Sequence, residues 1–408
     1  MKLSIVVIGD EILLGQVVDT NSGAIARAFG PYGWEVESIN VVGDDSEKIT
    51  ASINKALGNS DLVITTGGLG PTKDDITRTV LMEIFGGELI YDEEVAANIR
   101  EIFEKRGLQL NKLTKEQALV PSSCKVIQNR FGTAPLMWFE RGGKVLVSMP
   151  GVPFETEGML HEVVRKIREF FNSSDRFFHK TLIISGISES ALAEKLDEFE
   201  KSLLPGLHLA YLPQPGLIRL RLDGHNVAED CFEKELSRLT ALAGDLLIFE
   251  GDATPAEILL KVLSEQKMTF ASAESCTGGN IAHMITSVPG ASDCFLGSVV
   301  SYSNDVKENI LGVSLSDLQA CGAVSRSVVE QMAAGVCRAT GADCAVATSG
   351  IAGPGGGTPE KPVGTVWIAW CVKGSVTSCK FRFPGDRLRV IQRASNEAII
   401  TLIKLLKK

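Results

Sequence analysis

The chain has 408 residues, too many for one ordinary hydrophobic core, so we expect two or three domains. Its 44% hydrophobic and 22% charged residues are typical of a globular protein, and its net charge of −9 argues against a nucleic-acid groove as the main surface. No apolar run has the length of a membrane span, and residues 1–11 become acidic too early for a signal peptide. The cysteines include no C-x-x-C pair, which predicts reduced thiols in the cytoplasm.

Strand and helix patterns alternate over residues 1–172. Short apolar runs predict strands there, and amphipathic stretches predict helices between them. Such alternation is typical of a three-layer α/β domain: a parallel sheet with helices on both faces and ligands at the carboxyl ends of its strands. The expected strands are 3–8, 34–42, 62–65 and 144–148, and the expected helices are 21–29, 47–57, 74–85 and 153–171.

Two polar breaks, at 171–175 and 251–255, enclose a smaller middle module. This stretch has no G-x-x-G loop and no stacking pair of aromatic residues of the kind that RNA-binding modules use. We therefore interpret residues 173–250 as a small α+β connector. Residues 251–408 form a second α/β unit, with expected strands at 269–273, 295–301 and 344–348, a hairpin at 364–383 and a last helix from 387.

Ser275 begins a turn between a predicted strand at 268–273 and a predicted helix at 280–285. A hydroxyl at this position is presented at the rim of a sheet. We expect free backbone N–H groups and the positive end of the helix to lie beside it. A nucleophile and its oxyanion site need this arrangement.

The residues after Ser275 leave alternatives open. Their backbone N–H groups are candidate substrate contacts, those of the first three being the candidate oxyanion donors. Cys276 is also a rival nucleophile, because a thiol is intrinsically more reactive. In a purely structural reading, Ser275 or Thr277 caps the helix and the glycines serve the tight turn. The contact candidates are Cys276, Thr277, Gly278 and Gly279.

Tyr302 and Lys307 leave the strand at 295–301 and enter a helix, so they are expected on the same rim as Ser275. A lysine that is partly removed from water near a serine loses its proton more easily and can act as a general base. The alternatives are a solvated lysine in a first helical turn and a packed aromatic with its hydroxyl at the surface.

A glycine-rich loop at 349–357 follows another expected buried strand. Its backbone N–H groups can approach an anion closely, although no Walker lysine follows. Arg387, just before the last helix, has the planar fork that suits a phosphate. A plain flexible loop and a surface arginine are the alternatives.

Five stretches of this unit together resemble the C-terminal domain of the CinA family, which is known as nicotinamide mononucleotide deamidase. The resemblance covers about residues 252–408. It implies hydrolysis of the carboxamide of nicotinamide mononucleotide to nicotinic acid mononucleotide and ammonia, with no metal or cofactor. The five stretches are 273–279, 302–304, 349–354, 361–366 and 385–387.

The resemblance also implies a role for each of these residues. Ser275 is the implied nucleophile, Lys307 its base, and Tyr302 an assisting residue. The nucleotide is expected to be held by a set of residues from the glycine loop and the last helix. That set is Ser349, Gly350, Gly353 and Arg387.

Glycines and carboxylates gather after the strands of the first domain. Glycines at a strand-to-helix turn expose N–H groups to a phosphate, and carboxylates beside them can hold a divalent cation. Acidic residues in a first helical turn also interact with the helix dipole, which is the structural alternative. The phosphate candidates are Gly67, Gly68 and Gly70; the metal candidates are Asp10, Glu11, Asp44 and Asp74, with Asp75 as a further contact to substrate or metal.

These stretches, with 129–135 and 149–153, resemble the MoaB/MogA-type molybdopterin-binding fold in the variant that begins CinA proteins. The resemblance covers about residues 1–170, and the middle module, with 186–190 and 211–216, matches the family too. It implies an ADP-ribose pyrophosphatase that yields AMP and ribose 5-phosphate with a divalent metal. Relatives also suggest a homodimer.

The leading hypothesis is therefore a bifunctional hydrolase of pyridine-nucleotide salvage, with nicotinamide mononucleotide and ADP-ribose as its small-molecule partners. Two other classes stay open. One is a non-catalytic pterin- or nucleotide-binding protein, or a competence-linked partner of DNA-processing proteins, for which the negative charge gives no electrostatic support. The other is an enzyme that acts on molybdopterin itself.

Overall fold

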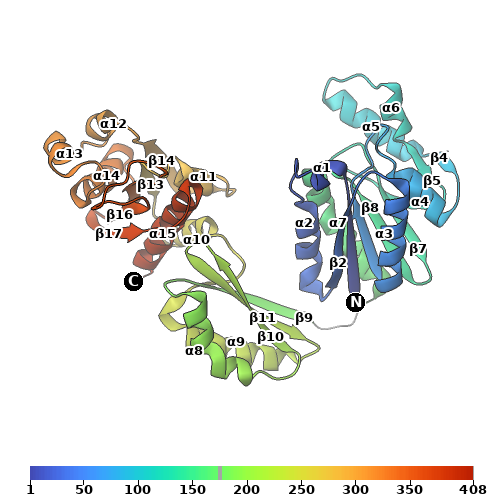
Figure 1. Cartoon of the computed structure of the whole chain (residues 1–408), viewed down its shortest axis with the longest axis horizontal. Helices are drawn as coiled ribbons and strands as arrows, with labels where there is room; N and C mark the ends of the chain where they lie inside the picture. Colours follow the sequence, from blue (N-terminus) through green and yellow to red (C-terminus); the bar gives the residue numbers. More distant parts are fainter. Residues whose placement is uncertain (173–176, 408) are drawn as a thin grey trace. The chain divides into compact units, whose positions relative to one another are not determined.

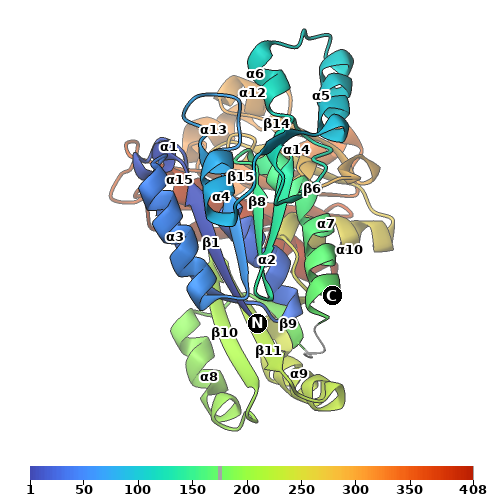
Figure 2. The same cartoon turned by 90° about the vertical axis from the view of Figure 1, so that its right-hand side faces the viewer.

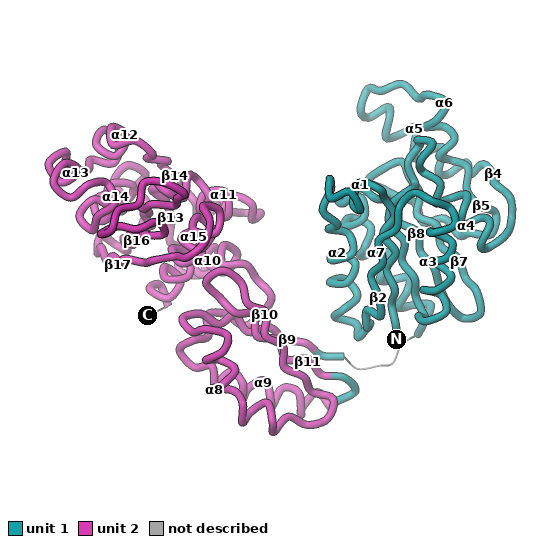
Figure 3. Tube along the Cα trace, viewed as in Figure 1, with its two compact units in different colours: residues 1–178, 225–227 teal, residues 179–224, 228–408 magenta. Residues whose placement is uncertain are grey.

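The computed structural model describes residues 1–172 and 177–407, and the break expected at 171–175 falls largely outside them. The chain divides into two units (Figure 3). The first covers Met1–Phe178 and His225–Val227, and the second covers His179–Gly224 and Ala228–Lys408. Within the described residues, no helix combines the length and apolar character that crossing a bilayer would need.

The first unit is built on a six-stranded sheet in the order β2-β1-β3-β8-β7-β6. The first four strands in this order are parallel, which confirms the predicted α/β class. At the other edge, β7 pairs antiparallel with β8, and β6 pairs antiparallel with β7. The strands are β1 (Lys2–Ile8), β2 (Glu35–Val42), β3 (Leu62–Thr66), β6 (Lys125–Ile127), β7 (Leu136–Arg141) and β8 (Lys144–Met149).

Helices cover both faces of this sheet (Figures 1 and 2). The period-2 alternation of β1 divides its side chains between two cores. Leu3 and Ile5 pack toward α2 (Asn21–Phe29) and α7 (Pro153–Phe171). On the other face, Val6 and Ile8 belong to the core that includes α3 (Ser46–Asn59) and α4 (Thr77–Phe85). The three layers are those predicted.

Residues 86–124 add a small lobe that the sequence analysis did not anticipate. It has its own core of Val95, Ala96, Ile99 and Ala118. Its elements are β4 (Leu89–Tyr91), α5 (Glu93–Lys105), α6 (Lys112–Glu116) and β5 (Leu119–Pro121). A four-residue helix, α1 (Asp10–Leu13), also follows β1 where only a turn was expected.

The second unit begins with the middle module. Its sheet has the order β10-β11-β9-β12, and a single helix, α8, joins β9 to β10. The elements are β9 (Phe177–Ile184), α8 (Glu189–Lys201), β10 (Leu207–Gln214), β11 (Leu217–His225), α9 (Glu229–Ala243) and β12 (Leu247–Glu250).

The rest of this unit is a five-stranded sheet in the order β14-β13-β15-β16-β17. The first three strands are parallel, and the last two form an antiparallel hairpin, as predicted. The strands are β13 (Phe270–Glu274), β14 (Phe295–Val300), β15 (Cys344–Gly350), β16 (Thr365–Val372) and β17 (Ser375–Arg382).

Helices again cover both faces. Buried residues of α10 (Pro255–Gln266), α11 (Asn280–Thr286) and α15 (Arg387–Leu406) form one core with the sheet. Those of α14 (Arg326–Thr340), with Leu318 of α13 (Leu315–Cys321), form the other. A short helix, α12 (Asn304–Asn309), follows β14.

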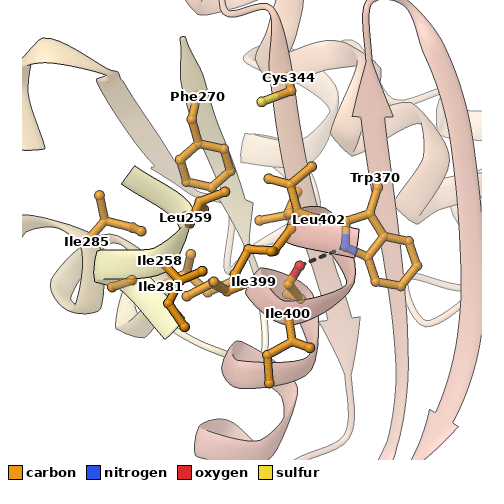
Figure 4. Packing of buried hydrophobic residues seen from close by; sticks show 14 of the residues in the cluster. Ile258, Leu259, Phe270, Ile281, Ile285, Cys344, Trp370, Ile399, Ile400 and Leu402 are labelled. Carbon is orange, nitrogen blue, oxygen red and sulfur yellow. Dashed lines mark hydrogen bonds between the residues drawn. The ribbon is translucent and has the colours of Figure 1, made fainter. Parts of the chain in front are cut away.

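The first of these cores is shown in Figure 4, where the indole of Trp370 donates a hydrogen bond of 2.8 Å to the carbonyl of Ala398. Ile183 and Ile248 of the middle module belong to the same core. Asn396 of α15 also donates to the Pro215 carbonyl at 2.7 Å. The module that we interpreted as a connector therefore shares its packing with the C-terminal domain.

Gly335 of α14 allows the segment after α12 to approach closely. A Cβ at this position would lie 2.1 Å from the carbonyl oxygen of Leu311. The neighbouring Val313 N–H donates to the Lys307 carbonyl at 3.0 Å. The contact therefore helps to place α12.

We expect Gly335→Ala to destabilise the second unit by about 1–3 kcal/mol through overpacking. Alanine is normally the better helix residue by about 1 kcal/mol, so the sign is opposite to that of helix propensity. Calorimetric unfolding measures it. The control is Gly58→Ala in α3, where nothing lies within 4 Å of the added Cβ, so a small gain is expected. A stabilising Gly335→Ala would contradict the close approach.

Candidate functional site

Ser275 and Lys307 meet at the carboxyl ends of β13 and β14. The Lys307 Nζ lies 3.2 Å from the Ser275 Oγ and 2.6 Å from the Ser301 carbonyl oxygen. The carbonyls of Tyr302 and Ser303 are each 3.5 Å away. The Lys307 side chain is only 1% exposed, so it is not the solvated lysine of the structural alternative.

The local fold explains this meeting. The parallel pairing of β13 and β14 aligns Glu274 with Val300, and the Ser301 N–H donates to the Glu274 carbonyl at 2.8 Å. Ser303 then caps α12 by accepting from the Val306 N–H at 3.3 Å. Because the helix starts directly after the strand, Lys307 reaches back to the strand end.

Burial shifts Lys307 toward its neutral form. Burial lowers the pKa of Lys307 below its ordinary value of 10.5, and only Cys276 opposes this shift. No carboxylate in the described parts of the chain lies within ion-pair distance of it. A neutral amine has two N–H groups for the carbonyls and one lone pair, which can accept the Ser275 proton.

Cys276 has a different environment from Ser275. It is 6% exposed, and burial raises the pKa of its thiol to about 12. The reactive thiolate is therefore strongly disfavoured.

The turn after Ser275 offers fewer N–H groups than expected. The N–H of Ser275 donates to the Thr348 carbonyl at 3.0 Å, and that of Gly278 donates to the Ser275 carbonyl at 3.2 Å. The N–H of Gly279 donates to a Glu274 carboxylate oxygen at 3.0 Å. Within the described residues, Cys276 and Thr277 keep backbone N–H groups with no protein partner.

N–H groups at the positive end of the following helix are already paired. The carboxylate of Glu274 accepts hydrogen bonds from the N–H groups of Ile281 and Ala282 at the start of α11, at 3.0 and 2.8 Å. Glu274, the last residue of β13, therefore supplies the negative charge that interacts with the start of α11.

The hydroxyls of Ser349 and Thr277 point into the fold. Ser349 is fully buried, and its Oγ donates to the Ala323 carbonyl at 2.7 Å. The hydroxyl is therefore already hydrogen-bonded within the fold, and the role of Ser349 in holding the nucleotide stays a prediction. The Thr277 hydroxyl is also buried and pairs with that of Thr348 at 2.7 Å.

Arg387 brings the remaining candidates together. Its guanidinium donates to the Tyr302 hydroxyl at 2.9 Å and to the Gly353 carbonyl at 2.8 Å. Tyr302 is 62% exposed rather than packed. Gly350 ends β15 at the start of the same loop. The exposed arginine, the tyrosine and the glycine loop therefore share one accessible edge.

A cavity of about 510 Å³ lies at the carboxyl ends of β1 and β3 in the first unit. It is lined by most of the residues predicted for this domain. Glu11, Asp44 and Asp74 contribute carboxylates, and Asp10 adjoins them through its N–H, which donates to Asp44 at 3.1 Å. The predicted glycines Gly67, Gly68 and Gly70, with Asp75, line the cavity as well.

The carboxylates lie near one another but do not form a complete set of metal ligands. Burial, with the charges of Asp10, Glu11 and Asp74, raises the pKa of Asp44. Among the described residues, no three histidine, cysteine or acidic side chains already stand in a metal-binding group. Hard oxygen donors whose charges repel fit a divalent cation such as Mg²⁺, which would offset that repulsion.

The glycines form a tight backbone cradle. Gly67 has a φ of +107°, and a Cβ there would lie 2.0 Å from the Ile8 carbonyl oxygen. The N–H of Gly67 donates to Met149, and that of Gly70 to Asp75. Of these three predicted phosphate donors, only Gly68 keeps an N–H with no partner in the described chain.

Asp75 acts mainly on the loop. Its two oxygens accept from the N–H groups of Gly70 and Thr72, at 2.8 and 2.9 Å. These bonds explain why α4 starts at Thr77, whereas the sequence predicted a start at residue 74. Its role as a substrate contact is not supported by this geometry.

Two buried polar residues were not assigned a role from the sequence. Asn21 is 6% exposed and lines the cavity, where its amide donates to Thr66 Oγ1 at 2.9 Å and to the Gly151 carbonyl at 2.8 Å. Glu274 is the other, at 0% exposed. A polar residue at the end of an apolar strand was the available signal for Glu274.

The chain thus combines a three-layer α/β domain, whose cavity carries glycines and carboxylates, with a C-terminal α/β domain that holds a buried serine–lysine pair. Family models match this organisation. Residues 4–169 match the probable molybdopterin binding domain, 179–243 the damage-inducible protein CinA KH domain, and 252–406 the CinA C-terminal domain.

The chain belongs to the CinA family. It is 42% identical to a CinA-like protein of Flavobacterium psychrophilum, over 100% of this chain and 99% of that protein. It is 41% identical to a CinA-like protein of Cytophaga hutchinsonii, over 98% and 96%. A solved structure described as the protein CinA with unknown function, from Thermoplasma acidophilum, is 37% identical with a TM-score of 0.38, covering 41% of this chain and 97% of that one.

The difference between the two neighbouring side chains gives a test. In the folded chain at pH 8, we expect iodoacetamide to modify the exposed Cys321 and Cys379 readily and Cys276 about 1000-fold more slowly, because little thiolate forms. Mass spectrometry of the peptides measures this. Unfolded protein is the control, in which all three should react alike. Rapid native modification of Cys276 would restore it as a rival nucleophile.

Proposed function

We propose that the C-terminal domain hydrolyses the carboxamide of nicotinamide mononucleotide, giving nicotinic acid mononucleotide and ammonia. The observation that carries the proposal is the buried Lys307 amine at 3.2 Å from the Ser275 hydroxyl. An amide is a poor electrophile, so its hydrolysis through a covalent intermediate needs an activated nucleophile and donors for the oxyanion.

The two residues can divide the chemistry as follows. Ser275 Oγ attacks the amide carbon while its proton passes to the neutral Lys307 amine. The free N–H groups of Cys276 and Thr277 receive the tetrahedral oxyanion. When the C–N bond breaks, Lys307 returns the proton to the leaving nitrogen, and ammonia departs.

The second half repeats the first with water. Lys307 takes a proton from a water molecule that attacks the acyl–serine ester, and the proton returns to Ser275 Oγ as the ester bond breaks. The products are the free acid and the original hydroxyl and amine. No redox change or external reagent is required.

The exposed edge suits the phosphate end of the substrate. Arg387 has its two guanidinium arms on neutral oxygens, those of Tyr302 and Gly353. A phosphate offers stronger charge-assisted hydrogen bonds in the same planar geometry. Arg387 and the glycine loop would then hold the nucleotide, with Tyr302 assisting.

We further propose that the first domain hydrolyses the pyrophosphate of ADP-ribose. Glu11, Asp44 and Asp74 would hold a divalent cation, which when bound would activate water and offset phosphate charge. The Gly68 N–H, which has no partner in the described chain, would donate to the phosphate from the cradle, and Asp75 keeps the loop at 70–75 folded. The Asn21 amide joins α2 to Thr66 of β3 beside the cavity.

Replacement of the serine–lysine pair tests the deamidase. We expect Ser275→Ala to abolish ammonia release from nicotinamide mononucleotide and Lys307→Met to lower kcat by about 10²–10⁴-fold, the usual contribution of a general base. Cys276→Ala should keep most of the activity, because only the backbone of that residue is used. Loss of activity in Cys276→Ala with activity kept in Ser275→Ala would overturn the assignment of the nucleophile. Binding of nicotinamide mononucleotide without turnover in the parent chain would favour a non-catalytic nucleotide-binding protein.

The same pair predicts a pH dependence. The base must be neutral, so activity should be low in acid and rise with pH through the pKa of Lys307. Because burial lowers that pKa, the rise should fall below the ordinary lysine value of 10.5. A profile of kcat/KM against pH measures it, and a rise only near or above 10.5 would contradict the buried neutral amine.

Asp44→Asn tests the first domain. We expect it to weaken Mn²⁺ binding by at least about 10-fold in calorimetry and to lower AMP release from ADP-ribose, since one charged oxygen ligand is lost. Ammonia release should not change. The matched control is Asp45→Asn, because that neighbouring carboxylate caps α3 and does not line the cavity. Equal metal binding in the Asp44 variant and the parent would exclude this cation site.

A further inference from the structure

Glu274 is a buried carboxylate with no cation beside it. It ends β13 immediately before Ser275 and is 0% exposed. Within the described residues it forms no ion pair, and its charge is met by neutral donors alone. Burying such a group costs several kcal/mol unless it is fully hydrogen-bonded.

Three of these donors are backbone N–H groups from the far side of the turn. One carboxylate oxygen accepts from Gly279 and Ile281, both at 3.0 Å, and the other accepts from Ala282 at 2.8 Å. The carboxylate therefore ties the end of β13 to the first turn of α11. The intervening residues, 275–278, are closed into a loop with fixed ends.

The remaining donors are hydroxyls of two adjacent strands. The hydroxyls of Ser272 in β13 and Ser298 in β14 each lie 3.3 Å from Glu274 Oε1 and 2.8 Å from each other, so the two O–H groups share their hydrogen bonds between the carboxylate and one another. Strand β14 leads within a few residues to Ser301, whose carbonyl holds the Lys307 amine at 2.6 Å. Glu274 thus contacts the elements that carry both members of the pair.

We propose that Glu274 is a positioning residue that sets the distance between Ser275 and Lys307 and aims the Cys276 and Thr277 N–H groups at the oxyanion. The proposal rests on the deamidase function proposed above. Because the carboxylate occupies the N–H groups at the start of α11, the substrate oxygen is left with the turn itself. The N–H groups at the start of α11 are therefore not available to an anionic group of the substrate.

The chemistry requires a carboxylate of this length. Glutamine has the same shape, but its amide group would place N–H groups against N–H donors that the second oxygen now satisfies. Aspartate keeps the charge but is one methylene shorter, so it cannot reach all three N–H groups from the same backbone position. Glu274→Gln and Glu274→Asp therefore disrupt the anchor in different ways.

The first experiment measures steady-state ammonia release by the full chain. We expect Glu274→Gln to lower kcat about 100-fold and Glu274→Asp about 10-fold, with KM within about 3-fold, because the nucleotide-holding edge at Arg387 is untouched. The matched control is Asp305→Asn, which removes an exposed carboxylate from α12 of the same domain and should leave both parameters near the parent values. A Glu274→Gln enzyme within 3-fold of the parent kcat overturns the proposal, as does a rise in KM with kcat unchanged.

The second experiment does not need a substrate. Amide hydrogen exchange of the full chain, read by mass spectrometry, should show faster exchange over residues 275–283 in Glu274→Gln, with exchange in α14 unchanged. Unchanged exchange over 275–283 overturns the positioning role. If the parent chain releases no ammonia, the deamidase proposal fails, and the exchange result still decides whether Glu274 anchors the turn. If Glu274→Gln does not fold, the same two readouts are made on Glu274→Asp.

Discussion

The burial of an uncompensated amine is the constraint on which the C-terminal site depends. An ammonium group without a counter-ion is expensive to remove from water, so the 1% exposed Lys307 is held toward its neutral form. Carbonyl groups at the end of β14 fix its N–H directions, above all that of Ser301 at 2.6 Å. In the mechanism that we propose, the lone pair of the neutral amine accepts the Ser275 proton. The cores on both faces of the sheet supply the stability that keeps this arrangement closed.

Parallel strands explain how residues far apart in sequence reach that point. The ends of β14, β13 and β15 are adjacent in the sheet, and backbone bonds cross between them: Ser301 to Glu274, and Ser275 to Thr348. Each strand therefore places one part of the site at the same edge of the sheet. The loops that follow differ in what they expose, and only the loop after β13 keeps a hydroxyl directed at the amine. Sheet register, rather than any single loop, sets the site's dimensions.

Much of this organisation was predictable from the sequence, because strands and helices bury residues with regular periods. The alternation at 3–8, 34–42 and 62–65 predicted the sheet, and the short connection from strand to helix predicted that Lys307 would approach Ser275. The hydrogen-bond partners of polar groups in turns were not predictable in the same way. Ser349, Asp75 and the N–H groups of Gly67 and Gly70 are used within the fold, and which partner a turn residue finds depends on tertiary contacts that no local pattern contains. The lobe at 86–124 was missed although α5 spans 13 residues, and its core is small.

The two candidate sites handle charge in opposite ways. In the C-terminal domain, the carboxylate of Glu274 is fully buried and accepts its hydrogen bonds from neutral donors. In the first domain, the pKa of Asp44 is raised by burial and by neighbouring acids, and among the described residues its carboxylate accepts a hydrogen bond from the Asp10 N–H. Such a cluster is relieved only when a cation or protons arrive. The amide-cleaving site and the metal-dependent phosphate site that we propose would suit these two environments. The difference follows from whether backbone N–H groups or other carboxylates surround each acid.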